Sequence, residues 1–228
     1  EDYVQTSDAI ELTVSTSKGR VKIDSSWLFA CDGCYSTVRK LTQIKGYEHS
    51  LSANSFIMID AMWEAEQATN RLNAFFQPDI SLLIIPYAKG GRSRFIAEIG
   101  RSAKFKQIDV PSLDDFKQIA ASCVPFAHKI SDRTWSSRFS IVERVADQFQ
   151  KGNIFLLGDA AHSHSPAGGM GMNTGIQDAM NLCWKLNMVS NNQISHLFLN
   201  TYNSERRYAA KQVISASKLT YWGISRCD

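Results

Sequence analysis

The sequence lacks a long apolar run and a strong charge of either sign. No stretch approaches the roughly 20 apolar residues of a membrane span, and no basic-then-apolar leader begins the chain. Lys and Arg number 25 against 22 Asp and Glu, interleaved without runs, for a net charge of +3. We therefore expect neither a membrane nor a nucleic-acid partner, because nucleic-acid binding needs a basic patch. A small neutral or weakly anionic ligand fits better.

Cysteine is scarce, and its spacing lacks a disulfide or zinc framework. The five cysteines are an odd number and are widely spread, which favours a reducing compartment, so we expect a cytoplasmic protein. Only Cys31 and Cys34, in "CDGC", lie close together. Zinc would need a second pair at matching spacing. We interpret this pair as structural or incidental, rather than as a redox dithiol, and expect no metal site.

The chain does contain two strand-loop-helix units that flank a run of strands. With 44% hydrophobic residues, the 228 residues can build a packed core. The two units cover residues 27–41 and 154–189, and the strands between them fall within residues 55–99. Further helices are predicted at 112–124 and at about 195–217. This order predicts an α/β fold with an inserted, mainly antiparallel sheet.

The second unit places Gly158-Asp159 directly after the apolar strand "IFLL". Ligands of open α/β sheets lie beyond the carboxyl ends of the strands, and a carboxylate there can accept hydrogen bonds from a polyol or a ribose. Alternatively, Asp159 only caps a turn. His162 and His164 could ligate a metal with Asp159, but we favour roles in structuring the loop.

The loop "SPAGGMGMN" leads into an amphipathic stretch. Thr174, with Gln177 three residues later, forms a capping-box pattern that predicts a helix from Thr174 to Val189. The positive end of its dipole would then stabilise negative charge near the glycines. Alternatively, this is a glycine-rich turn into an ordinary core helix. The apolar positions predict a buried face made of Ile176, Ala179, Met180, Cys183 and Leu186.

The first unit repeats the arrangement, with Asp32-Gly33 after an apolar strand and Ser36 and Arg39 just beyond. Arg39 could form a simple ion pair with Asp32, or it could reach a phosphate. Spacing alone leaves both alternatives open.

Three segments resemble known motifs: "ACDGCYSTVRK", "GNIFLLGDAAHSHSPAGGMGMNTGIQDAMNLCWKL" and "YNSERRYAAKQVISAS". They resemble the Asp-Gly motif, the Gly-Asp motif and the Tyr/Glu-Arg-Arg helix of the FAD-dependent aromatic hydroxylases, the single-component flavoprotein monooxygenases of the phenol hydroxylase and para-hydroxybenzoate hydroxylase type. The resemblance implies a partial, doubly wound FAD-binding domain (residues 1–50 and 148–228) and a substrate-side sheet (51–147). It also implies that NAD(P)H reduces FAD and that a small phenolic substrate is hydroxylated with O₂, through a flavin C4a-hydroperoxide.

The resemblance also assigns roles to residues. Asp159 would bind the ribityl hydroxyls of FAD, and Pro166, the candidate catalytic residue, would lie beside the reactive edge of the isoalloxazine. Asp32 and Arg39 would lie near the pyrophosphate and the approach route of NAD(P)H. The remaining cofactor-binding candidates are glycines and the backbone that would meet the pyrimidine side of the ring: Gly158, Gly169, Gly171, Met172 and Asn173. Candidates for the substrate pocket wall are Phe75, Phe76, Leu83 and Ile85.

The chain departs from the family at its N-terminal end. Members begin with a βαβ unit that carries G-x-G-x-x-G and grips the FAD pyrophosphate, and no such motif occurs in these 228 residues. We therefore expect an N-terminally truncated chain that self-associates or pairs with the missing portion. The alternative is a truncated or degenerate module without catalysis that retains part of the flavin site.

Overall fold

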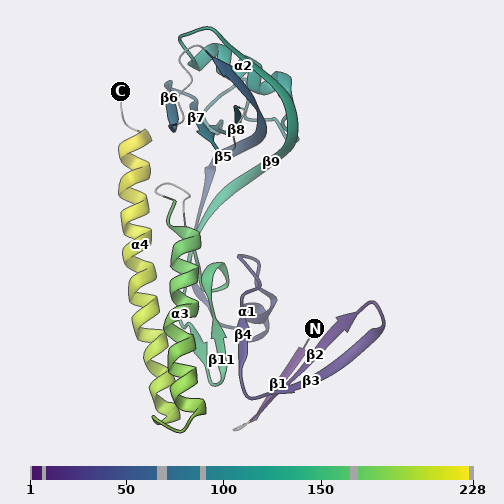
Figure 1. Cartoon of the computed structure of the whole chain (residues 1–228), viewed down its shortest axis with the longest axis vertical. Coiled ribbons are helices and arrows are strands. Elements are labelled where there is room, and N and C mark those ends of the chain that lie inside the picture. Colours follow the sequence, from purple (N-terminus) through teal and green to yellow (C-terminus); the bar gives the residue numbers. More distant parts are fainter. Residues whose placement is uncertain (1, 7–8, 66–70, 88–90, 165–168, 226–228) are drawn as a thin grey trace. The chain divides into compact units, whose positions relative to one another are not determined.

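The structure, a computed structural model, describes residues 2–6, 9–65, 71–87, 91–164 and 169–225. The chain divides into two compact units, which are described separately. Unit 1 contains Glu1–His49 and Val142–Tyr221, and unit 2 consists mainly of Ser50–Ile141 (Figure 1). The mixed α/β class predicted from the sequence is confirmed.

Unit 1 contains two small sheets. The first is antiparallel, in the order β1 (Asp2–Gln5), β2 (Ile10–Thr16) and β3 (Gly19–Ser25). β3 begins directly after a tight turn with Gly19, whose φ of +115° is a conformation that glycine adopts readily. The second sheet has the order β10 (Gln150–Lys151), β11 (Ile154–Leu156) and β4 (Leu28–Ala30). β11 and β4 are parallel, as the two strand-loop-helix units require.

The described residues of unit 1 also form five helical segments, and α3 and α4 run side by side (Figure 1). They are α1 (Thr37–Leu41), the 3₁₀ turn η1 (Gly158–Ala160), α3 (Gly171–Ser190), the 3₁₀ turn η2 (His196–Asn200) and α4 (Thr201–Ser225). The Tyr202 ring meets Phe155 edge to face at 5.7 Å, and its hydroxyl donates to the Leu156 carbonyl at 2.7 Å. Burial raises the pKa of Tyr202 far above its usual range, so this hydroxyl stays a hydrogen-bond donor that holds α4 against β11.

Two expectations for α3 are wrong. The helix begins at Gly171, and Thr174 is a buried residue of its first turns whose hydroxyl donates to the Met170 carbonyl at 2.8 Å. The buried face also differs from the predicted one, because Ile176, Met180 and Cys183 are exposed. The fully or nearly fully buried residues of α3 are instead mostly polar: Thr174, Asp178, Leu182 and Lys185.

Unit 2 is built on antiparallel strands, as predicted. They are β6 (Asn73–Phe76), β7 (Ser81–Pro86), β8 (Arg92–Glu98) and parts of β5 (Gly46–Ala65) and β9 (His128–Ala146). With β12 (His162–Ser163), the sheet order is β12-β9-β5-β8-β7-β6. The predicted helix is α2 (Leu113–Cys123), and Ser112 and Asp115 form a capping box at its start.

Strand register decides which pocket-wall candidates share a face. Phe75 pairs with Leu82, which is fully buried, and Phe75 packs against the core of unit 2, 6.0 Å from the Phe126 ring. Since side chains alternate along a strand, Phe76, Leu83 and Ile85 belong to the opposite face of the sheet. Only these three remain candidates for the wall of a substrate pocket.

Candidate functional site

The two aspartate-bearing loops leave neighbouring parallel strands. In the register of β4 and β11, Ala30 lies opposite Leu156, and Asp32 and Asp159 follow within three residues of these positions. Both carboxylates therefore follow the carboxyl ends of adjacent strands, at the edge of the sheet where α/β proteins bind ligands. The structure thus brings the two sequence motifs together.

Arg39 joins these two loops. Its side chain is buried and donates to the Ala160 carbonyl at 2.5 Å, in the loop after β11, and to the Cys34 carbonyl at 2.7 Å, in the loop after β4. Arg144 also donates to the Cys34 carbonyl. Because one rigid guanidinium bonds both loops, Arg39 fixes the spacing between them.

Asp32 lies at the start of α1. Its carboxylate accepts hydrogen bonds from the backbone N–H groups of Thr37 at 2.8 Å and Val38 at 3.1 Å. Partial burial alone would raise the pKa of Asp32, but hydrogen bonds from Ser36, Val38 and Thr37 outweigh it and lower the pKa. Asp32 is therefore anionic at neutral pH and holds the first loop to its helix.

Asp159 differs from Asp32 in that its carboxylate accepts no hydrogen bond from the described residues. It is exposed in η1 and has no hydrogen-bond or ion-pair partner among the residues that the structure describes. The preceding Gly158 has a φ of +55°, a conformation that other residues adopt only with strain. A charged acceptor at the end of a buried strand is thus available for ligand hydroxyls.

The turn that carries Asp159 packs directly against α3. A Cβ atom added to Gly175 would lie 3.3 Å from the Gly158 Cα atom, closer than nearly all real Cβ contacts. Two glycines therefore allow the backbones of η1 and α3 to approach each other. This close approach brings the Asp159 turn beside the first turns of α3.

The N-terminal end of α3 is suited to bind negative charge. Its N-cap residue is Met170, which makes no side-chain capping bond. Intrahelical bonds leave the first N–H groups of a helix unused, here those of Gly171, Met172 and Asn173, and the macrodipole of a 20-residue helix adds positive potential. Met172 and Asn173 are exposed. Gly169, with a φ of +63°, shapes the approach, and Pro166 lies outside the described residues.

These features fit the flavin that the motifs imply. An unused carboxylate would meet hydroxyls, and a helix terminus without a side-chain cap would meet the electron-rich edge of the ring. Nothing in the described contacts of Asp159, Gly171, Met172 or Asn173 competes with those roles.

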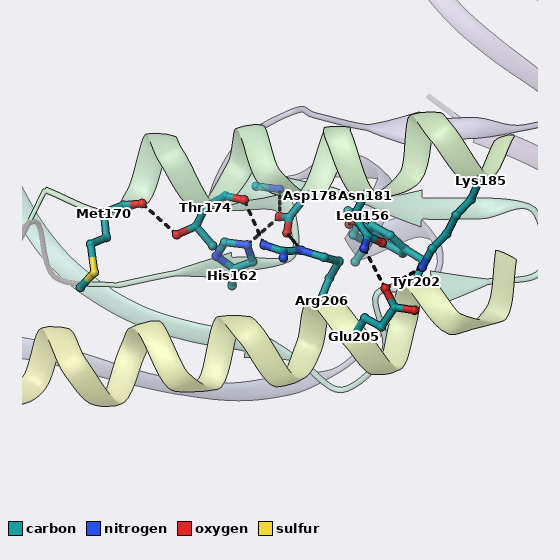
Figure 2. Close-up of polar contacts among 11 residues, drawn as sticks. Leu156, His162, Met170, Thr174, Asp178, Asn181, Lys185, Tyr202, Glu205 and Arg206 are labelled. Carbon is teal, nitrogen blue, oxygen red and sulfur yellow. Dashed lines mark hydrogen bonds and ion pairs between the residues drawn. The ribbon is translucent and has the colours of Figure 1, made fainter. Parts of the chain in front are cut away.

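His162 and Asp178 form a buried pair that sequence reasoning missed. The His162 ring nitrogen Nε2 lies 2.8 Å from Asp178 Oδ2, and Arg206 Nε donates to Asp178 Oδ1 at 2.6 Å (Figure 2). The signal was available in the spacing: Thr174, Asp178 and Lys185 follow one another at i, i+4 and i+11, which places them on one helix face. Within the described ranges, no group of three or more His, Cys, Asp or Glu could hold a metal.

Cys31 and Cys34 are free thiols, one exposed and the other half-buried. Burial raises the pKa of Cys31, and nearby Asp32, Asp178 and Cys183 raise it further, whereas reactive redox thiols have a lowered pKa. We expect iodoacetamide at pH 7.5 to modify Cys31 more slowly than the thiol of N-acetylcysteine, as followed by mass spectrometry. Faster modification of Cys31 would instead support the redox dithiol.

Comparison with known proteins identifies the family. Residues 3–217 match the family described as "FAD binding domain". The chain belongs to this family.

Two monooxygenases and one hydroxylase are among the proteins similar to this chain. The chain is 30% identical over 196 residues to pentachlorophenol 4-monooxygenase of Sphingobium chlorophenolicum, covering 86% of this chain and 36% of that protein. It is 33% identical over 198 residues to rifampicin monooxygenase of Rhodococcus hoagii, covering 86% and 41%. Among solved structures, the anhydrotetracycline hydroxylase OxyS of Streptomyces rimosus superposes with a TM-score of 0.81 at 26% identity, covering 98% of this chain and 44% of that one.

The chain thus spans less than half the length of each of these three proteins. No helix among the described residues is long and apolar enough to cross a membrane.

Proposed function

We propose that this chain is part of an FAD-dependent monooxygenase that hydroxylates a small aromatic substrate with NAD(P)H and O₂. The observation that carries the proposal is the exposed Asp159 carboxylate on a glycine turn that packs against the N-terminal end of α3. Membership of the FAD-binding family supports FAD as the ligand of this arrangement. The relatives' names, which include a pentachlorophenol and an anhydrotetracycline enzyme, support an aromatic substrate.

Each residue of the site has a role in this proposal. Asp159 accepts hydrogen bonds from the ribityl hydroxyls, and the backbone of Gly171, Met172 and Asn173 meets the pyrimidine side of the flavin ring. The dipole of α3 stabilises negative charge on that side. Bound FAD supplies the transfer of electrons from NAD(P)H and the activation of O₂. Gly169 would lie beside the ring, and Pro166 keeps the catalytic role that the family resemblance implies for it.

The loop after β4 has a supporting role. Asp32 holds the start of α1, and Arg39 ties this loop to the one that carries Asp159. In our proposal the two residues fix the conformation of the loops at this edge of the sheet, near the pyrophosphate of FAD and the approach route of NAD(P)H. The bonds of Arg39 to the Ala160 and Cys34 carbonyls set the orientation of its guanidinium at this edge of the sheet.

We assign the substrate side to unit 2. Phe76, Leu83 and Ile85 share the face of the sheet that the core does not use, as the pairing of β6 with β7 requires. Aromatic and branched side chains on such a surface would contact a planar ring through dispersion and burial of apolar area.

The second candidate is a non-catalytic module that keeps part of the flavin site. The described site favours it as far as it consists of groups that hold a flavin, a carboxylate acceptor and a helix terminus, which such a module would also keep. The two candidates differ in turnover, because a module of this kind can bind flavin without oxidising NAD(P)H.

One experiment tests the proposal. The protein is purified at its natural full length, incubated with excess FAD, desalted and examined by visible absorption. We expect the spectrum of bound oxidised flavin, and oxidation of NADH or NADPH that speeds up when phenolic compounds are added. A folded, colourless protein would contradict the assignment to FAD, and a yellow protein without NAD(P)H oxidation would favour the non-catalytic module.

A further inference from the structure

Asp178 is the centre of a buried polar cluster between α3, α4 and the Gly158 turn (Figure 2). Its side chain has no exposed surface. Oδ2 accepts the backbone N–H of Gly158 at 2.9 Å and lies 2.8 Å from His162 Nε2, while Oδ1 accepts Arg206 Nε at 2.6 Å. One carboxylate therefore bonds three separate segments of unit 1.

We propose that Asp178 is a positioning residue for flavin binding. It holds the Gly158-Asp159 turn at a fixed position along α3, so that Asp159 and the N-terminus of α3 can both contact the same FAD molecule. This inference rests on the proposed function and adds a residue outside its binding set. Asp178 itself has no exposed atom with which to touch the cofactor.

Two residues of α3 contact the Gly158 turn. Gly175 lies against the Gly158 Cα atom, and Asp178, almost one helical turn later, accepts the Gly158 N–H. Because both contacts come from α3, the Asp159 turn is fixed relative to the helix whose first turn forms the other half of the site. A shift of the turn along α3 would separate the two groups that bind FAD.

The cluster requires an anion at position 178. Burial alone would raise the pKa of Asp178, but hydrogen bonds from His162, Arg206 and Gly158 outweigh it and lower the pKa. The carboxylate is therefore charged at neutral pH and faces three donors. An asparagine offers one acceptor oxygen, and its NH₂ group would face a donor, so at least one of these hydrogen bonds would be lost.

His162 and Arg206 keep the carboxylate in place. The His162 ring stacks on Phe149 with 5.7 Å between ring centroids. Arg206 also reaches the Thr174 carbonyl at 3.4 Å, so α4 contacts the first turns of α3 as well as Asp178. Both partners are fixed by packing or by a second bond, which leaves the carboxylate little freedom to move.

A second polar cluster on the same two helices provides a matched control. Lys185 Nζ donates to Thr201 at 2.7 Å and to Glu205 at 2.8 Å. Asn181 also donates to Glu205, and Figure 2 shows Asn181, Lys185 and Glu205 together. This cluster joins α3 to α4, as the Asp178 cluster does, but its hydrogen bonds within the described residues do not reach the Gly158 turn. Its loss should change stability without moving Asp159.

The experiment compares FAD affinities in the protein at its natural full length, measured by titration of the apoprotein with FAD and quenching of flavin fluorescence. Thermal unfolding of each apoprotein checks that it is folded. We expect Asp178→Asn to raise the Kd for FAD about tenfold and Glu205→Gln to change it less than twofold. His162→Gln, which keeps an N–H donor for Asp178, should stay closer to the wild type than His162→Phe.

Two results would overturn the inference: a folded Asp178→Asn protein with wild-type affinity, or His162→Gln and His162→Phe variants with equal affinity. If Asp178→Asn does not fold, the two His162 variants decide. A wild-type protein that binds no FAD would instead refute the proposed function, so the two failures are distinguishable.

Discussion

Replacing Asp159 by alanine is expected to weaken FAD binding by a factor of about 10 to 150. The carboxylate is charged, exposed and without a partner among the described residues, so its removal leaves the folded protein nearly unchanged. The ribityl hydroxyls would lose a charged acceptor, and a hydrogen bond to a charged group contributes about 1.5–3 kcal/mol. Each 1.4 kcal/mol corresponds to a factor of ten in Kd.

The measurement is an FAD titration of the apoprotein at its natural full length. Asp24→Ala removes another exposed carboxylate of unit 1, on β3, and serves as the control. Asp159→Asn, which keeps one acceptor oxygen, should bind FAD with intermediate affinity. If Asp159→Ala binds FAD as tightly as the control does, Asp159 is not part of the flavin site.

The ends of the strands at the site were predictable because the apolar segments and the turn residues that follow them indicate the same boundaries. Short apolar segments that end in Asp-Gly or Gly-Asp predicted β4 and β11 and the loops after them, and the structure places these strands side by side. In unit 2, alternating polarity and turn residues predicted β6, β7 and β8. The face on which Phe75 lies was not predictable, since it depends on the register with β7.

The predicted start of α3 was wrong because Thr174 lies within the first turns of the helix and does not act as its N-cap. Thr174 and Gln177 match a capping box, yet the Thr174 hydroxyl bonds back to the Met170 carbonyl inside the helix. The close approach of Gly158 to Gly175 could not be predicted either, because the two glycines are 17 residues apart in the sequence.

The predicted buried face of α3 was also wrong, because it was chosen by hydrophobicity alone. Hydrophobic periodicity assumes that apolar residues are buried, but here Asp178 and Lys185 are buried and Ile176 and Met180 are exposed. Burial of these charges depends on Arg206 and Glu205, which lie 20 to 28 residues away along the chain. Only a fold that brings α3 and α4 together supplies those partners.

The 228-residue chain on its own is expected to show no appreciable hydroxylase activity. We also expect its Kd for FAD to be at least a hundredfold higher than that of the same chain preceded by the G-x-G-x-x-G βαβ unit of a relative. In our proposal this chain contacts the ribityl and isoalloxazine parts of FAD. The βαβ unit of the family grips the pyrophosphate. Half of the contacts gives far less than half of the affinity, because the cost of immobilising the ligand stays the same.

The same comparison tests the surfaces that would carry the βαβ unit. Among the described residues β4 is one of the two edge strands of its sheet, and Phe29 on it is 41% exposed. One side of α3 presents large exposed apolar side chains: Met172, Ile176, Met180 and Trp184. An unpaired edge and an uncovered apolar helix face promote association, so we expect the chain alone to form oligomers in analytical ultracentrifugation and the extended chain to be less associated. A monomer of the 228-residue chain that copurifies with stoichiometric FAD would contradict both expectations, since it would need neither a partner for β4 nor a second grip on the cofactor.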